Sequence, residues 1–311
     1  MKKRILFIGA GGCGTNWASA FIKNVSKDAT NNGDEYGALI VDGSDSNIRG
    51  VDDLKDVEKW ICPDTDGAGS WRAQCAVKYI EYVKQKFSEM PEADIYIIGY
   101  SSFGGSGSVF GPELHRMLLE SGKKVFGITN VSGATMNASS NSLNVINGLT
   151  AYAKAANKPA ITTIINNDEK SVNETDIIVS ATIDAIAHVT GTNLQGLDTA
   201  DIGAFLDFTR HSIAPSLVEL RIYANLEAIN SESGKILTTL SAIETIDSPR
   251  PQIDQLDGFF AYGTNVETHL ATMVGDIANI QKMLIGKVEH FEAKLSSHQA
   301  VKVEGADEMK F

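Results

Sequence analysis

The chain has 311 residues, of which 43% are hydrophobic and 21% are charged, and its formal net charge is −12. This composition is typical of a globular protein, and the length is sufficient for two domains. The acidic balance argues against nucleic acid or an anionic membrane surface as the main partner, because both attract a basic face. No apolar run approaches the roughly 18 residues of a membrane helix. We therefore expect small molecules or other proteins as partners.

Cysteine and histidine usage favours a reducing compartment. The three cysteines, Cys13, Cys62 and Cys75, show no paired pattern, which is typical of a cytoplasmic protein. The six histidines are scattered, without the spacing of a metal site. We expect a cytoplasmic protein with no metal bound by histidine or cysteine.

The first half of the chain alternates short apolar runs with helical patterns. The apolar runs predict strands, and the helical patterns fall between them. These predicted strands are 4–8, 37–42, 94–100, 124–131 and 160–165. Such alternation indicates a doubly wound parallel sheet covered by helices on both faces.

The second half predicts a smaller domain and a long terminal helix. A helical stretch ends near Val189, and three later runs look like strands of a second, smaller sheet. These runs are 217–224, 235–242 and 257–262. From Val266 to Leu295 apolar residues recur every three or four positions, so we expect one helix, roughly 45 Å long, laid against a domain. Residues 300–311 show no pattern and are interpreted as a tail.

The predicted fold class is therefore α/β. It comprises a doubly wound parallel-sheet domain, a central helix, a smaller α+β second domain, and a long C-terminal helix followed by a tail. The predicted boundaries of these five units are 1–172, 173–192, 193–263, 264–299 and 300–311.

A glycine-rich loop, Gly9–Gly14, follows the first predicted strand and opens a helix. It matches G-x-G-x-x-G, the fingerprint of dinucleotide sites. Glycines let backbone amides approach a phosphate, and a helix N-terminus favours negative charge. Asp42, at the end of the second strand, is placed to bind a ribose hydroxyl. A nicotinamide-dependent oxidoreductase is one hypothesis for this loop, and a glycine turn without a ligand is another.

A second glycine loop, Phe103–Val109, also follows a strand and precedes a helix. A dinucleotide site needs only one such loop, so two at the same sheet edge indicate a longer phosphate chain held from both sides. Ser106 and Ser108 add hydroxyl donors to the backbone amides. A third small-residue loop, Asp66–Ser70, is placed to close over the terminal phosphate. The alternative is a flexible surface loop, and the P-loop motif G-x-x-x-x-G-K-[ST] is absent.

The second glycine loop resembles the G-G-G-[ST]-G-[ST]-G signature of the tubulin and FtsZ superfamily, with Phe103 and Val109 in place of the first and last glycines. Its continuation to Pro112 looks closest to the divergent phage tubulins of the PhuZ type. Several loops are similar to the phosphate-binding loops of that family. The matching residues are Gly11, Gly12, Cys13, Gly14 and Asn16; Asp42 and Asp45; Gly67, Ala68, Gly69 and Ser70 in the loop that senses the γ-phosphate; and Phe103, Gly104, Gly105, Ser106, Gly107 and Ser108.

The resemblance implies that the ligand is GTP or GDP, with Mg²⁺ held mainly through phosphates and water and with help from Asp45. In the family the base is read by an asparagine after a late strand, here Asn167, and by a polar residue that starts the central helix. Asp176 is the candidate for the second position, and Asn173 is its alternative. A carboxylate accepts from both N1–H and the exocyclic amine of guanine, whereas adenine offers no such pair of donors. The ordinary interpretations are a turn residue for Asn167 and a helix-start residue for Asp176.

The segment Gly196–Ile202 resembles the family's catalytic loop, in which two acids lie three residues apart. Asp198 and Asp201 occupy those positions and would orient a water for attack on the γ-phosphate. The same spacing is also a normal way to begin a helix, and the two roles are compatible. In the family these acids meet the nucleotide of the next subunit, which implies a head-to-tail homopolymer.

The sequence thus predicts a tubulin-like GTPase that polymerises into dynamic filaments in the cytoplasm of a host bacterium. Its partner is itself, with no direct contact to nucleic acid or membrane. The resemblance implies a phage cytoskeleton that positions phage DNA or a replication compartment. A Rossmann-type NAD(P)-dependent oxidoreductase and a nucleotide-binding regulator that does not polymerise are the alternatives.

Overall fold

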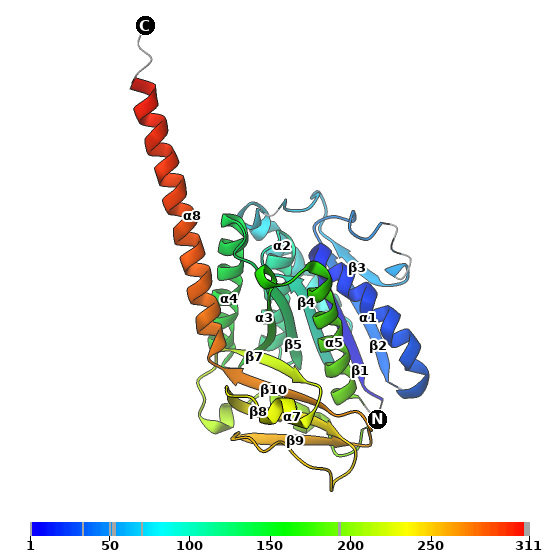
Figure 1. The fold of residues 1–311 in the computed structure, drawn as a ribbon. Helices are drawn as coiled ribbons and strands as arrows, with labels where there is room; N and C mark the ends of the chain where they lie inside the picture. The colour runs from blue at the N-terminus through cyan, green and yellow to red at the C-terminus, as the bar shows by residue number, and fades with distance from the viewer. Residues whose placement is uncertain are drawn as a thin grey trace.

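The structure is a computed structural model that describes residues 2–32, 34–49, 51, 54–69, 71–191 and 194–307. Within these residues the strands form one ten-stranded sheet, in the order β3-β2-β1-β4-β5-β6-β7-β10-β8-β9. Figure 1 shows the first six strands in the upper body of the molecule and the last four packed below them.

The first six strands are parallel. Five of them were predicted from the alternating pattern, and the sixth, the short edge strand β3, was missed. Their central members are buried along nearly their whole length, because helices cover both faces of the sheet. The strands are β1 Arg4–Ala10, β2 Glu35–Asp42, β3 Glu58–Ile61, β4 Ile95–Ser101, β5 Val125–Val131 and β6 Ala160–Asn166.

Five helices cover this part of the sheet. They are α1 Gly11–Asn32, α2 Arg72–Lys86, α3 Gly107–Glu120, α4 Met136–Ala156 and α5 Val172–Thr190. Helices α1 and α5 share one hydrophobic core with the sheet, and α2, α3 and α4 share the core on the opposite face. In Figure 1, α1 and α5 lie in front of the strands and α3 lies behind them. The doubly wound arrangement predicted from the sequence is therefore confirmed.

The later strands extend the first sheet instead of forming a separate one. Residues 160–162 of β6 pair in parallel with 217–219 of β7. The remaining strands follow β7 in antiparallel and parallel pairs. These elements are β7 Leu217–Tyr223, β8 Lys235–Ile243, β9 Asp257–Tyr262 and β10 Thr268–Val274, with the short helices α6 Thr199–Leu206 and α7 Leu226–Asn230.

The C-terminal helix begins later and ends later than the sequence predicted. Residues 268–274, expected in the helix, form β10, and Gly275 turns the chain with φ +125° before α8 begins. Helix α8 spans Asp276–Asp307, so residues 300–307 of the predicted tail are helical. Its first turns pack on α4 through Ile280 and Leu284. Figure 1 shows the rest of α8 projecting alone beyond the body. None of the helices in the described ranges is long and apolar enough to cross a membrane.

A histidine lies in the core of the larger part of the sheet. His115 on α3 is fully buried, and neither ring nitrogen has a hydrogen-bond partner among the described residues. Burial lowers the pKa of its imidazole to about 4. The neutral ring is therefore the form that the folded chain accommodates.

This histidine should make stability depend on pH. The unfolded chain takes up a proton on His115 near pH 6.5, whereas the folded chain does so only near pH 4. Stability is therefore complete above pH 6.5 and is lost as the pH falls toward 4, by at most ~3 kcal/mol. We expect His115→Leu to reduce the pH dependence of the free energy of unfolding, measured with urea between pH 4 and 6.5. His290→Leu, on the exposed side of α8, should keep the pH dependence of the wild type. Equal slopes for His115→Leu and wild type would contradict this account.

Candidate functional site

A cavity of about 360 Å³ opens at the carboxyl ends of β1, β2 and β4. Four loops line it, and they include both glycine loops and the third small-residue loop predicted from the sequence. The lining residues are Ala10, Gly11, Gly12 and Cys13; Asp42, Ser44, Ser46 and Asn47; Asp66, Gly67, Ala68 and Gly69; and Ser101, Phe103, Gly104, Gly105, Ser106 and Gly107. Ser70, predicted with the third loop, lies outside the described residues.

The two glycine loops touch each other across the floor of this cavity. Gly11 has φ +70°, and a Cβ built on it would lie 2.6 Å from the backbone nitrogen of Gly107. A Cβ on Gly107 would lie 2.8 Å from the carbonyl oxygen of Ala10. Distances this short exclude a side chain at either position. Since the loops open α1 and α3, two helix N-termini converge on the cavity and favour an anion there.

Of the remaining residues of the first loop, Gly14 packs against the sheet and Cys13 lines the cavity. A Cβ on Gly14 would lie 2.3 Å from the carbonyl oxygen of Gly99 in β4, so Gly14 allows α1 to pack closely on the sheet. Cys13 lines the cavity. Burial, and secondarily the charge of Asp176, raise the pKa of the Cys13 thiol to about 12, against a hydrogen bond from Asn130. The thiol therefore stays protonated at neutral pH and is not a nucleophile.

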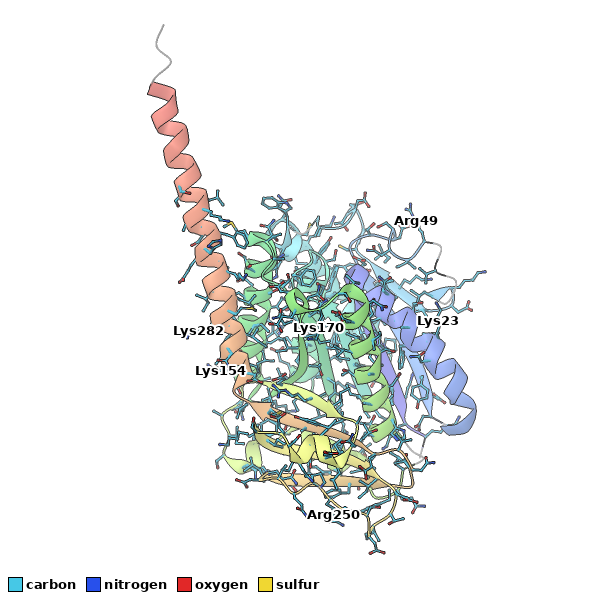
Figure 2. The ribbon with its side chains drawn as sticks, viewed as in Figure 1. Lys23, Arg49, Lys154, Lys170, Arg250 and Lys282 are labelled. Atoms are coloured by element: carbon cyan, nitrogen blue, oxygen red, sulfur yellow. The ribbon has the colours of Figure 1, made fainter. Side chains whose placement is uncertain are left out.

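Asp42 is buried and its carboxylate is already bonded within the loop after β2. It accepts hydrogen bonds from the backbone N–H of Gly43 at 2.6 Å and from Asn47 Nδ2 at 2.8 Å. Burial raises the pKa of this carboxyl, and the hydrogen bonds from Asn47, Gly43 and Ser106 partly offset that rise. These bonds do not favour the ribose-binding role that an oxidoreductase would require. Asp45, by contrast, is exposed and forms a 2.6 Å ion pair with Arg49. Figure 2 shows Arg49 at the outer rim of the molecule.

Some lining residues were not selected as site residues from the sequence. Ser44 Oγ donates to Asp66 Oδ1 at 2.9 Å, which joins the loop after β2 to the third small-residue loop. Asn47 holds Asp42, and its side chain lies against Gly12. The signal that would have found them is the polar run Ser44–Asn47 directly after a strand.

The second glycine loop holds itself in shape through one of its serines. Ser108 is buried, and its hydroxyl donates to the carbonyl oxygen of Gly105 at 2.9 Å. The backbone carbonyl of Ser108 in turn accepts from Arg72 Nε at 3.1 Å. Ser106 lines the cavity with its neighbouring glycines. The loop therefore presents Ser106 to a ligand and uses the Ser108 hydroxyl internally.

The predicted base-binding residues Asp176, Asn167 and Asn173 lie in separate places, and Asn16, predicted as part of the first phosphate loop, lies with one of them. Asn16 and Asp176 meet in a smaller cavity of about 70 Å³ between α1 and α5, where Asp176 Oδ1 accepts from Trp17 Nε1 at 2.8 Å. Asn167 is half-buried, and its Oδ1 accepts from Thr175 Oγ1 at 2.7 Å. Asn173 is exposed in the first turn of α5. The structure thus brings Asn16 and Asp176 together beside Cys13.

Asp198 and Asp201 form the N-terminal capping box of α6. Asp198 Oδ1 accepts from the backbone N–H of Ala200 at 2.7 Å and of Asp201 at 2.9 Å, and Asp201 Oδ2 accepts from the backbone N–H of Asp198 at 3.1 Å. These backbone bonds lower the pKa of the Asp198 carboxyl, with a smaller contribution from Lys3. The capping interpretation is therefore confirmed.

These two acids lie at the opposite end of the sheet from the cavity. Lys3, whose charge acts on Asp198, directly precedes β1, and the cavity begins where β1 ends. Seven residues of β1 separate the two ends by roughly 23 Å. The loop before Asp198 is anchored on β9, where Gln195 and Tyr262 exchange backbone hydrogen bonds of 2.8 and 2.6 Å. Figure 1 shows the N-terminus and β9 at the same end of the molecule.

No group of three or more histidine, cysteine, aspartate or glutamate side chains able to hold a metal ion occurs among the residues that the structure describes.

The close approach of the two glycine loops can be tested by alanine substitutions at two positions of the second loop. Gly107→Ala should lower the free energy of unfolding by about 2 kcal/mol, because its Cβ meets backbone atoms that cannot move independently. Gly104→Ala is the matched control, since its Cβ would lie 3.7 Å from the nearest atom, Ser101 Oγ. Chemical denaturation of both variants measures the difference. Equal stability of the two variants would show that the loops do not meet as described.

No protein-family model matches the chain. The chain is similar in sequence to two proteins named phage tubulin-like protein. With that of Pseudomonas phage 201phi2-1 it shares 24% identity over 283 residues, which cover 89% of this chain and 81% of the relative. With that of Pseudomonas phage PhiPA3 it shares 26% identity over 196 residues, 62% of each chain.

Solved structures extend the similarity to nearly the whole fold. The structure of the phage tubulin PhuZ with GDP matches with a TM-score of 0.83 at 19% identity, covering 94% of this chain and 92% of that one. The PhuZ201 filament matches with a TM-score of 0.81 at 18% identity and the same coverage. CetZ1 from Haloferax volcanii, a GDP-bound monomer, matches with a TM-score of 0.67 at 15% identity, covering 94% of this chain and all of that one.

These matches define a tubulin-like fold. The resemblance to the tubulin and FtsZ superfamily, predicted from the glycine loops, is thereby confirmed. In sequence the chain is similar to phage tubulin-like proteins, and in fold it is similar to solved phage tubulins of the PhuZ and TubZ type.

Proposed function

We propose that this chain binds GTP between its two glycine loops and hydrolyses it at a head-to-tail contact with a second copy of itself. One observation carries the proposal: the cavity lined by the glycine loops and the paired acids occupy opposite ends of one rigid sheet. A single molecule cannot join them, whereas two stacked molecules can. Among the matched structures, PhuZ is described with GDP and PhuZ201 as a filament, which supports both the ligand and the assembly.

The cavity favours a chain of phosphates. Its floor is backbone, because Gly11 and Gly107 exclude side chains where they meet. The free N–H groups at the starts of α1 and α3 are suited to phosphate oxygens. Ser106 adds a hydroxyl from the second loop. Phosphates would therefore be held largely by the main chain, with Gly67, Ala68 and Gly69 on the far side.

The smaller cavity beside Cys13 is the place for the base. Trp17 fixes one oxygen of the Asp176 carboxylate, which leaves the other oxygen to accept from guanine N1–H and the exocyclic amine. Asn16 supplies an amide next to it. We retain Asn167 as a second reader of the base, and Asn173, being exposed, as the alternative to Asp176.

Magnesium fits this site through oxygen ligands. Asp42, Asp66 and Ser44 line the same cavity as the glycine amides, and phosphates brought next to two carboxylates need a cation between them. Mg²⁺ prefers oxygen ligands and retains several waters. We propose Asp66 and Asp42, in place of the outward-facing Asp45, as the side chains nearest to the ion, which would neutralise charge on the phosphates when bound.

Hydrolysis would require the neighbouring molecule. Asp198 and Asp201 would orient and polarise a water for in-line attack on the γ-phosphate held by the next chain. The lowered pKa of Asp198 keeps it ionised for this role. A head-to-tail contact that does not close generates a filament. Within each molecule we propose residues 173–192 as the central helix that links the nucleotide domain, 1–172, to the unit that begins at 193.

The cellular role rests on the family resemblance alone. We propose a phage-encoded cytoskeletal filament in the cytoplasm of a bacterial host, which positions phage DNA or a replication compartment. The relatives come from Pseudomonas phages, which supports the setting.

Amide variants separate capping from catalysis. Asn caps a helix as well as Asp does, and an Asn at 201 keeps an oxygen that can accept the backbone N–H of Asp198, so Asp198→Asn and Asp201→Asn should keep α6 and GTP binding intact. Loss of the carboxylate should lower GTP turnover on the order of a hundredfold and give longer-lived filaments. Wild-type turnover should rise more than linearly with protein concentration. Phosphate release and pelleting measure both effects.

Three results would contradict the proposal. Turnover equal to wild type in Asp201→Asn would remove the acid from catalysis. GTP binding without pelleting polymer at any concentration would favour a non-polymerising regulator. Tight NAD(P) binding without GTP turnover would favour the oxidoreductase.

A further inference from the structure

Beneath the cavity lies a tyrosine that touches three of its four loops. Tyr79 on α2 is fully buried, and its ring stacks on Phe110 of α3 at a centroid distance of 4.3 Å. Its hydroxyl lies directly against Gly43 in the loop after β2, where a Cβ would come within 1.9 Å of the oxygen. Gly43 therefore has to be glycine for this tyrosine to reach the loop.

The other loops reach the same hydroxyl through polar side chains. Ser106 of the second glycine loop, Thr65 and Cys75 all surround it closely enough to act on the pKa of Tyr79. Thr65 in turn donates to the carbonyl oxygens of Gly43 at 2.6 Å and Cys62 at 2.8 Å. The third loop is attached at the same point, because the backbone N–H of Gly67 donates to the carbonyl oxygen of Gly43 at 3.0 Å.

The hydroxyl nevertheless lacks a partner in hydrogen-bonding geometry within the described part of the chain. A buried hydroxyl without a partner costs free energy, on the order of 1–3 kcal/mol. Rotation of the Ser106 hydroxyl toward it would remove that cost. Ser106 also lies close enough to Asp42 to act on the pKa of that carboxyl, so its orientation bears on the loop after β2 as well as on Tyr79.

We infer that Tyr79 is a positioning residue of the nucleotide site, whose hydroxyl bonds to Ser106 and holds the three loops in register when phosphates occupy the cavity. This inference rests on the proposed function. It also gives α2 a defined role. The helix follows the third loop directly, and it meets the second glycine loop at two points, Arg72 on Ser108 and Tyr79 on Ser106.

A double-mutant cycle tests the inference. Tyr79→Phe keeps the ring and its stacking and removes only the hydroxyl, and Ser106→Ala removes the proposed partner. Each should weaken binding of Mg²⁺-GTP by about tenfold, and the double variant should be no weaker than Ser106→Ala alone. Unfolding of the nucleotide-free Tyr79→Phe chain should occur at the wild-type denaturant concentration or above it, because an unpartnered hydroxyl has been removed.

The control is Tyr82→Phe, three residues along α2 and half-buried, which lines neither the cavity nor its glycine loops and should bind Mg²⁺-GTP as wild type does. Wild-type affinity in Tyr79→Phe, or an additive loss of about a hundredfold in the double variant, would overturn the inference. A loss of nucleotide-free stability as large as the loss of binding would assign Tyr79 a merely structural role and also overturn it. Failure of the wild-type chain to bind GTP would overturn the proposed function instead.

Discussion

Two stretches of backbone meet without side chains between them where Gly11 approaches Gly107. This contact requires glycine at both positions, because a single Cβ on either would overlap a backbone atom. It brings the starts of α1 and α3 to the same point at the carboxyl end of the sheet, where their N–H groups face one cavity. The loop after β2 and the third small-residue loop then close around it through Asp42, Ser44 and Asp66. The cavity therefore forms because the N-termini of α1 and α3 lie so close together.

The sheet that positions this cavity also fixes how far it lies from the acids. Strand β1 spans Arg4–Ala10, between Lys3, whose charge acts on Asp198, and Gly11 at the cavity, and α5 covers one face of the same sheet. Both are held in a continuous hydrophobic core that includes Trp17, Val179 and Phe205. Because a packed core does not shorten, the two halves of the proposed site cannot meet inside one molecule. In this account assembly completes the active site, so that hydrolysis follows filament formation rather than preceding it.

The parts that sequence predicted correctly are those where local patterns have a direct structural cause. The buried parallel strands and the glycine loops were found because apolar runs end in glycine at a helix start. The junction of β6 with β7 was missed, since only pairing between distant residues produces it. Strand β10 was mistaken for helix because it is buried over most of its length, so that it lacks alternation, and Leu270 and Met273 also fit a helical spacing. Gly275 marks the true boundary.

Within the site, the sequence predicted which loops form the cavity more accurately than it predicted the roles of individual side chains. Phe103–Gly107 line the cavity as expected, but Ser108 turns its hydroxyl back onto Gly105. Asp45 matches the family by position and yet pairs outward with Arg49. Asn47, Asp66 and Tyr79 gained their importance only from three-dimensional contacts. The direction of a polar side chain depends on its neighbours in space, and these come from other loops.

A mixing experiment addresses the division of the site between molecules most directly. One chain carries Asp198→Asn and Asp201→Asn, so that it binds GTP but lacks the acids. The other carries Gly104→Asp, at a cavity-lining position where a Cβ meets no atom closer than 3.7 Å, so that a carboxylate repels phosphate while the acids remain. Each alone should hydrolyse GTP poorly, and an equimolar mixture should regain a substantial part of the wild-type rate. A mixture no more active than the sum of its components would contradict a site completed by a second molecule.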